Sequence, residues 1–252
     1  MRLSEQTVSL LKNFAGINQN IQFKTGNRLQ TISAQKNILV NAEVPESFPS
    51  DFAIYDLNKM LGVMSVFQDP ELEIGDKTMK VAGKVNYMFA DPSMIVIPPE
   101  KELAFPEAEV TFTMSNNDFT ETVKLAGLLG LPHVCVVGDG SKITLGATDV
   151  NNSSSDDYVT EVGTTDKNFC MVFKIENLKL FSGDYNVEIT SKGISKFSHT
   201  SINLQYFIAT ESDSSFGGYC NEMIFCGLKN IGPLRSVIVF YQVTYTSPSQ
   251  IS

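Results

Sequence analysis

The feature that most constrains the fold of this chain is an amphipathic helix that occurs twice, each time with one lysine opposite its apolar stripe. At 100° per residue, Lys12 lies roughly 150° from the centre of the stripe formed by Leu3, Thr7, Leu10, Leu11 and Phe14. Lys124 lies roughly 160° from the stripe formed by Phe119, Thr122, Val123 and Ala126. Ser4 and Ser115 are predicted N-caps, and Asp118 completes capping-box spacing in the second copy. One such lysine is typical of any solvated helix, so the recurrence is what indicates two halves of similar design.

The elements around these helices follow the same order in both halves. A third apolar stripe, formed by Leu57, Met60, Leu61 and Met64 with Lys59 behind it, predicts a helix over about 56–67. Alternating apolar residues predict antiparallel strands in the first half at 21–24, 29–33, 38–42, 72–74, 79–81 and 85–89. In the second half, a short helix is predicted over about 174–180. Alternating apolar residues predict strands there at 134–137, 143–147, 158–162, 185–190 and 204–210. Aligning Lys12 with Lys124 superposes the two orders, which is evidence of an internal duplication.

Composition restricts the chain to an ordinary globular class. Of its 252 residues, 42% are hydrophobic and 19% are charged. Its apolar runs fall far short of the ~20 residues of a membrane span, and residues 1–20 lack the pattern of a signal peptide. The net charge of -9 argues against a protein that holds nucleic acid by bulk charge, so any positive DNA-contacting surface must be confined to one face.

The segment 90–109 separates the two halves and reads as an extended connector. Four prolines, Pro92, Pro98, Pro99 and Pro106, exclude it from a central strand. The run from Met94 to Ile97 makes this connector unusually apolar, which indicates that something docks there.

Residues suited to catalysis or metal binding are scarce. His133 and His199 are the two histidines, and GxSxG and HExxH motifs are absent. The four cysteines, Cys135, Cys170, Cys220 and Cys226, lack zinc-site spacing and are predicted to be reduced structural thiols. The run 138–142 has the wrong glycine spacing for a phosphate loop, and its Asp-Gly pair predicts a hairpin turn. The sequence therefore predicts a protein that is not an enzyme and that uses no metal or cofactor.

Four separated phrases, in order along the chain, carry a resemblance to a known family. They are LLKNFAGIN at 10–18, AIYDLNKMLGV at 53–63, ADPSMIVIPP at 90–99 and YFIATESDSSF at 206–216. Together they resemble the DNA polymerase sliding clamp of T-even-like bacteriophages, a clamp of the PCNA type, over residues 1 to about 216. The resemblance implies an α+β fold with two similar clamp domains, 1–89 and 110–216, joined by the connector 90–109. Each domain is expected to have an antiparallel sheet outside and two helices inside.

The resemblance also implies how the chain works. Three subunits would close head to tail into a homotrimeric ring with helices lining the hole, because a heterologous contact whose rotation closes gives a ring. Double-stranded DNA, bound without sequence preference, would then meet Lys12, Lys59 and Lys124, and less directly Lys174 and Lys179 on the short fourth helix. A sparse positive lining is consistent with the acidic chain, because weak phosphate contacts permit sliding.

Further partners follow from the resemblance alone. An ATP-driven clamp loader would place the ring, and the replicative polymerase would tether to it beside the connector. Late-transcription factors are suggested as users of the same dock. The candidate dock residues are Met94, Ile95, Val96, Ile97, Leu103 and Phe207, with the alternative that they pin the connector to the sheet. A phage clamp would work in the cytoplasm of the infected bacterial host, with no membrane partner.

Two questions stay open at the level of sequence. Residues 217–252 lie outside the resemblance, with Gly217 and Gly218 predicted as a hinge and 236–245 as an apolar strand. The alternative function is a phage structural or receptor-binding β-rich protein that happens to contain two similar domains.

Overall fold

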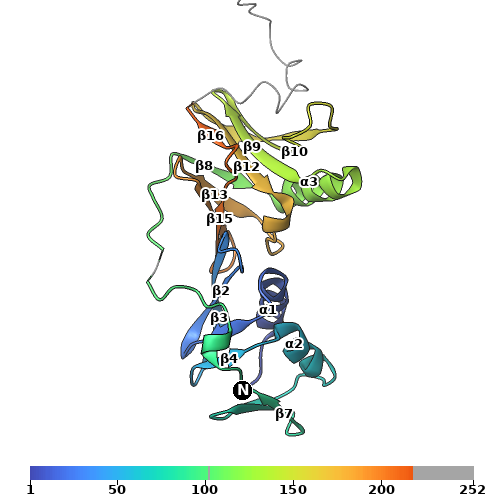
Figure 1. Ribbon diagram of the computed structural model, residues 1–252, viewed down its shortest axis with the longest axis vertical. Coiled ribbons are helices and arrows are strands. Elements are labelled where there is room, and N and C mark those ends of the chain that lie inside the picture. The colour runs from blue at the N-terminus through green and yellow to red at the C-terminus, as the bar shows by residue number, and fades with distance from the viewer. Residues whose placement is uncertain (102, 218–252) are drawn as a thin grey trace, which may run out of the picture.

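The computed structural model describes residues 1–101 and 103–217, so the predicted strand at 236–245 lies outside the described residues. Figure 1 shows two halves stacked along the long axis of the molecule. The α-helices lie along one side, and residues 90–101 and 103–109 run along the opposite side. The helices and the connector therefore belong to different faces.

The described residues contain three α-helices, α1 (Glu5–Ile17), α2 (Leu57–Ser65) and α3 (Asn116–Leu129). Both serine caps are confirmed, because Ser4 accepts a hydrogen bond from the amide of Thr7 and Ser115 accepts one from the amide of Asp118. Helix α3 ends at Gly130, whose left-handed backbone (φ 68°) suits a residue without a Cβ. The predicted burial of the α1 stripe is confirmed for Thr7, Leu10, Leu11 and Phe14.

The predicted helix over about 174–180 is wrong. Residue Lys174 is the last residue of strand β12 (Asn168–Lys174), and only one 3-10 turn, η2 (Ile175–Asn177), follows it. The strand extends through Lys174, the first residue of the predicted helix, because the preceding run Phe169 to Phe173 is buried throughout and pairs along its length with β9 (His133–Asp139). A continuous apolar run has neither the helical nor the strand period, so its pairing partner decides its conformation.

The first half contains two small antiparallel sheets in addition to two long strands. Strand β1 (Ile21–Phe23) pairs with β4 (Phe52–Ile54), and Phe23, Phe52 and Phe89 stack over this pair. A three-stranded sheet is formed by β5 (Leu72–Ile74), β6 (Thr78–Val81) and β7 (Val85–Met88). Strand β7 lies at the edge of that sheet.

The second half contains a five-stranded antiparallel sheet in the order β11-β10-β9-β12-β16. Its remaining members are β10 (Lys142–Thr148), β11 (Tyr158–Thr164) and β16 (Ser215–Phe216). The hairpin predicted at 138–142 is confirmed, since β9 and β10 pair across it and Asp139 accepts hydrogen bonds from the amides of Ser141 and Lys142. Helix α3 packs on β9, β10 and β11.

A six-stranded sheet joins the two halves, in the order β2-β3-β15-β14-β13-β8. Its members are β2 (Gly26–Ile32), β3 (Ile38–Phe48), β8 (Val110–Met114), β13 (Tyr185–Ile189), β14 (Ile194–His199) and β15 (Leu204–Ala209). Strand β3 of the first half pairs with β15 of the second, in register from Leu204 opposite Ala42 to Ile208 opposite Ile38. The halves are therefore joined by backbone hydrogen bonds as well as by the connector.

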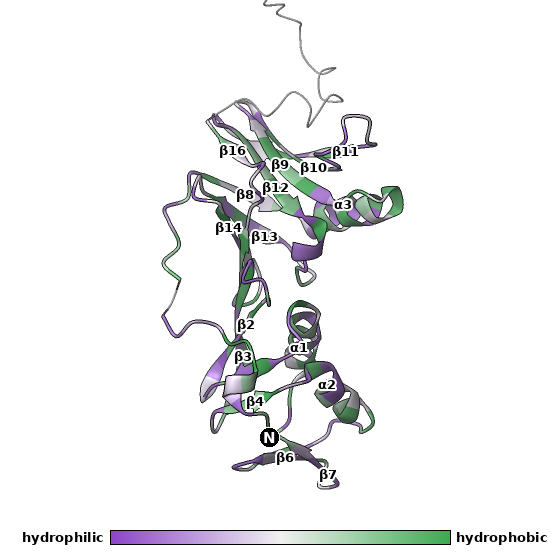
Figure 2. Ribbon diagram, viewed as in Figure 1, coloured by the Kyte–Doolittle hydropathy of each residue, from purple (hydrophilic) through white to green (hydrophobic). Residues whose placement is uncertain are grey.

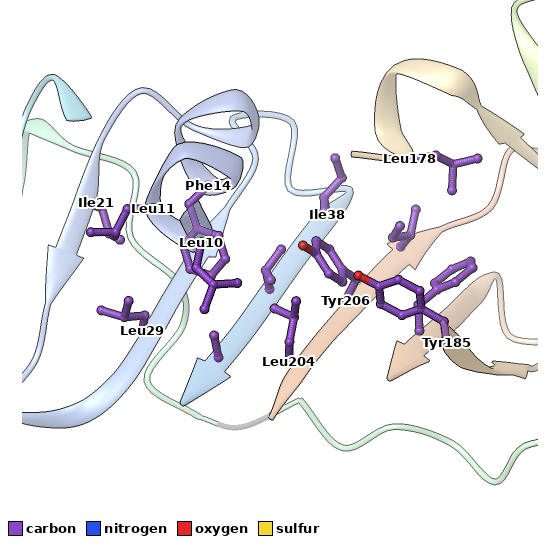
Figure 3. Packing of buried hydrophobic residues seen from close by; sticks show 14 of the residues in the cluster. Leu10, Leu11, Phe14, Ile21, Leu29, Ile38, Leu178, Tyr185, Leu204 and Tyr206 are labelled. Atoms are coloured by element: carbon purple, nitrogen blue, oxygen red, sulfur yellow. The ribbon is translucent and has the colours of Figure 1, made fainter. Parts of the chain in front are cut away.

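The core is continuous across this junction. Figure 2 shows apolar residues concentrated on the central strands of the second half, while the helices carry both apolar and polar residues. In Figure 3, Leu10, Leu11 and Phe14 of α1 lie on one side of Tyr206, and Tyr185 and Leu178 lie on the other. All six belong to one buried cluster. Burying an aromatic or leucine side chain of this size contributes about 1.5–3 kcal/mol each, so the halves stabilise one another.

Candidate nucleic-acid interface and docking surface

Helix α1 is held in place by a carboxylate that the sequence did not single out. Glu46, on β3, accepts a hydrogen bond from the hydroxyl of Thr7 at 2.6 Å and another from the backbone amide of Ser4. Partial burial alone would raise the pKa of the Glu46 carboxyl, but the hydrogen bonds from Thr7 and Ser4 outweigh it and hold that pKa below its ordinary value. An ionised carboxylate at the N-terminus of a helix also interacts favourably with the positive end of the helix dipole.

Lys12 lies on the exposed side of this fixed helix, as the stripe predicts. On the opposite side of the helix, Thr7, Leu10, Leu11 and Phe14 are fully buried. Lys12 is therefore exposed to solvent on α1, and α1 lies on the helix-bearing side of the molecule (Figure 1).

Lys59 lies in the first turn of α2 and is exposed. Asp56 caps this helix by accepting the amide hydrogen of Lys59 at 2.8 Å, and its carbonyl accepts the hydroxyl of Tyr87 at 2.9 Å. Lys59 also lines an open hollow of about 470 Å³ with Tyr55 and Met88. The lysine thus borders an apolar surface as well as solvent.

Lys124 is exposed on α3, opposite the buried side chains of Phe119, Thr122 and Ala126. The same helix carries acids near β11: burial first, and then the nearby Glu121 carboxylate, raise the pKa of Tyr158. The α3 surface is therefore mixed in charge.

The other two predicted DNA-facing lysines have protein partners. The ammonium of Lys174 lies 3.2 Å from a carboxylate oxygen of Glu211. The ammonium of Lys179 donates to the carbonyl of Gly16, in the last turn of α1. Both residues are exposed, but each charge already has an acceptor within the chain.

The structure divides the predicted dock residues into exposed and buried groups. Met94, Ile97 and Leu103 are exposed, while Ile95 and Phe207 are buried. The amide of Val96 donates to the Asn20 side chain, and its carbonyl accepts from Asn18. Ile95 and Val96 thus hold the connector against the first half, which leaves the exposed group available to a partner.

An aromatic residue that the sequence reasoning missed covers Phe207. The ring of Phe105 lies 5.9 Å from that of Phe207, centroid to centroid, and the ammonium of Lys196 lies 5.3 Å above the Phe105 ring. A lone phenylalanine in a proline-rich connector carries no periodic signal, so this contact required the fold.

The described part of the chain offers no candidate metal site and no membrane-spanning helix. Among residues 1–101 and 103–217, no group of three or more His, Cys, Asp or Glu side chains could hold a metal ion. No helix in those ranges is long and apolar enough to cross a membrane. Cys135 and Cys170 are buried and form no disulfide, while Cys220 and Cys226 lie outside the described residues.

The architecture defines the class of protein first, because solved structures of two kinds of sliding clamp share this fold. One is PCNA of A. fulgidus with the C-terminal region of FEN-1 bound, with a TM-score of 0.63 and 15% identity over 83% of this chain and 96% of that one. Another is the Helicobacter pylori beta clamp bound to a DNA ligase peptide, with a TM-score of 0.63 and 12% identity over 84% of this chain and 65% of that one. At these identities the likeness shows the fold alone. The fold is that of the sliding clamps.

Sequence comparison then gives the particular family. The family described as "DNA polymerase processivity factor" matches residues 4–95, and the one described as "gp45 sliding clamp, C terminal" matches residues 111–212. The sliding clamp of Vibrio phage KVP40 is 34% identical over 223 residues, which cover 84% of this chain and 100% of the relative. The sliding clamp of Enterobacteria phage T4 is 30% identical over 229 residues, which cover 85% and 99%. The chain belongs to this family of phage sliding clamps, which confirms the predicted resemblance, and it is a non-enzymatic processivity factor of a phage DNA polymerase.

Proposed function

We propose that three copies of this chain close head to tail into a ring around duplex DNA, with Lys12, Lys59 and Lys124 facing the hole. The observation that carries the proposal is the position of the three α-helices on one side of the molecule, each with an exposed lysine opposite buried residues (Figure 1). A face built in this way offers positive charge to phosphates without reading bases, which is what sliding requires.

The ion-pair partners of the predicted lysines, within the described residues, support the proposal. No carboxylate of residues 1–101 or 103–217 lies within ion-pair distance of Lys12, Lys59 or Lys124. Lys174 and Lys179, in contrast, already have acceptors. We therefore assign the DNA-facing role to the first three lysines and give the other two at most a secondary part in it.

Exposed apolar side chains support ring closure. Leu128 and Leu129 at the end of α3 are exposed, Leu128 by 82%. In the first half, Tyr55, Val66 and Met88 are exposed at or beside α2 and β7. Large exposed apolar groups on both halves fit a heterologous contact, in which one surface of a copy covers a different surface of the next.

The partners follow from the same proposal. The replicative polymerase docks on the exposed apolar residues of the connector, Met94, Ile97 and Leu103, and late-transcription factors use the same surface. An ATP-driven loader opens the ring and places it on DNA in the cytoplasm of the infected bacterium. The exposure of three large apolar side chains on an extended segment supports this dock.

Two measurements test the ring. Light scattering should give a mass of three chains, and the full-length chain should increase the length of product made per binding event by its polymerase when loader and ATP are present. A stable monomer would refute the ring. A trimer that leaves product length unchanged would refute the processivity role and favour a structural role in the phage particle.

A matched pair of charge reversals tests the lining. We expect the K12E/K124E double variant to lower the retention of loaded rings on circular DNA, since each lost phosphate contact reduces the dependence of log binding constant on log salt by about 1. The K77E/K192E variant changes the net charge equally, at turns between strands, and should behave as wild type. Loss of the trimer in K12E/K124E would instead place those lysines at the subunit contact.

A further inference from the structure

A polar seam connects α1 of the first half to the segment 178–181 of the second half, on the side of the sheet that carries the helices. Asn13 of α1 is its centre: its amide donates to the carbonyl of Lys179 at 2.9 Å, and its carbonyl oxygen accepts the hydroxyl of Tyr206 at 2.8 Å. The ammonium of Lys179 returns to α1 by donating to the carbonyl of Gly16. Three hydrogen bonds thus tie one turn of a helix to residues more than a hundred positions away in sequence.

The second half holds its side of the seam rigidly. Tyr206 is fully buried on β15, and its oxygen accepts the amide of Phe181 at 3.1 Å. Tyr185, also fully buried, donates its hydroxyl to the carbonyl of Phe181 at 2.7 Å. Burial raises the pKa of both tyrosines, so they remain protonated donors under ordinary conditions. Figure 3 shows Tyr206 between the α1 side chains and Tyr185.

The seam adds a second layer to the junction between the halves. The pairing of β3 with β15 joins the halves within the sheet. Two strands joined only by such a ladder can still twist relative to one another, because sheet twist varies between strands. The hydrogen bonds of the seam join α1 to Lys179 and Tyr206, on the helix-bearing side of the sheet. The seam and the β3–β15 ladder are therefore two attachments in different layers, and together they oppose this rotation.

We propose that Asn13, Lys179 and Tyr206 form an interdomain latch that fixes the angle between the α1-bearing and α3-bearing halves. Lys179 is then a positioning residue that completes the C-terminal turn of α1, where a cation also interacts favourably with the helix dipole. The consequence for DNA rests on the proposed function: the latch fixes the distance between Lys12 and Lys124, and a subunit that keeps one curvature opens the ring at a contact between subunits.

The test measures that distance directly in the full-length chain. Spin labels are placed at K12C and K124C in a C220S/C226S background, while the buried Cys135 and Cys170 are retained. When the doubly labelled chain is diluted with an excess of unlabelled chain, so that a ring holds at most one labelled copy, pulsed electron spin resonance should give one narrow distance distribution. We expect Y206F, which removes a hydroxyl, and K179M, which removes the ammonium, each to broaden the distribution and shift its mean.

Matched variants separate the latch from other effects. K179R keeps a donor and should restore the narrow distribution, and K77M changes a lysine outside the seam and should leave it unaltered. N13L removes both hydrogen bonds of the Asn13 side chain and should also broaden the distribution; if it fails to fold, the K179M and K179R pair still decides the question. An unchanged distribution in both Y206F and K179M would overturn the proposal, as would a loss of DNA retention in K179M with an unchanged distribution, because Lys179 would then act on DNA itself. No DNA is needed for the distance measurement, so a failure of the ring or of processivity is seen separately.

Discussion

Glu46→Gln should destabilise the protein by loosening the N-terminus of α1. The carboxylate of Glu46 accepts hydrogen bonds from Thr7 and Ser4, and hydrogen bonds to a charged group each contribute about 1.5–3 kcal/mol when well formed. Glu46 is only partly buried, so solvent screening reduces that figure, and glutamine keeps one neutral acceptor. The expected loss at neutral pH is about 1 kcal/mol in the free energy of unfolding, or about 2–4 °C in Tm for a chain of this size.

Urea denaturation followed by far-UV circular dichroism measures this loss, because the chain contains no tryptophan to report by fluorescence. The pKa of Glu46 is lowered in the folded state, so its contribution is present above the ordinary value near 4.5 and is lost as pH falls through the folded pKa. Wild type and variant should therefore converge in acid, at one fixed protein concentration. Glu71→Gln, at an exposed glutamate, is the control. A difference between wild type and E46Q that persisted undiminished in acid would refute the assignment.

Three further changes have defined outcomes. Leu103→Ala should weaken binding of the polymerase several-fold by removing an exposed apolar anchor, while Lys101→Ala on the same connector should not, as measured by titration calorimetry. Gly138→Ala should cost about 1–3 kcal/mol in a urea titration, because the new Cβ would lie 2.4 Å from the ring of Phe169 and 2.8 Å from a backbone carbonyl. Gly62→Ala should raise stability by about 0.5–1 kcal/mol in the same assay, since nothing lies within 4 Å of the new Cβ and the residue is helical. The reverse order of the two glycine variants would contradict the packing described for β9 and α2.

The three α-helices were the most predictable part of the fold because their signals are local, although the short helix predicted over about 174–180 was wrong. The stripe behind Lys12 and the cap at Ser4 lie within a few turns of one another, and both are confirmed. Strands were less predictable. Strand β8 follows the proline-rich connector and was not predicted, although Val110, Phe112 and Met114 alternate inward. Such a short run gains its conformation from pairing with β13, far along the chain.

In the candidate site, too, features set by local sequence were predictable and contacts between distant segments were not. Exposure of Lys12 and Lys124 follows from helical period alone, since the apolar stripe fixes which side is buried. The partners of Lys174 and Lys179 do not, because Glu211 and Gly16 come from elements that meet them only in the folded chain. The same holds for Phe105, whose ring lies over Phe207.

The sequence by itself determined the class of this protein: two similar halves, capped amphipathic helices with outward lysines, and the phrases that belong to phage sliding clamps. Tertiary structure decided how the halves are joined. One sheet runs through both halves by the pairing of β3 with β15, and Asn13 ties α1 to a distant loop. The physical reason is range: periodicity and capping act over a few residues, whereas the pairing of strands more than 150 residues apart depends on the entropy of loop closure and on the shared core that repays it.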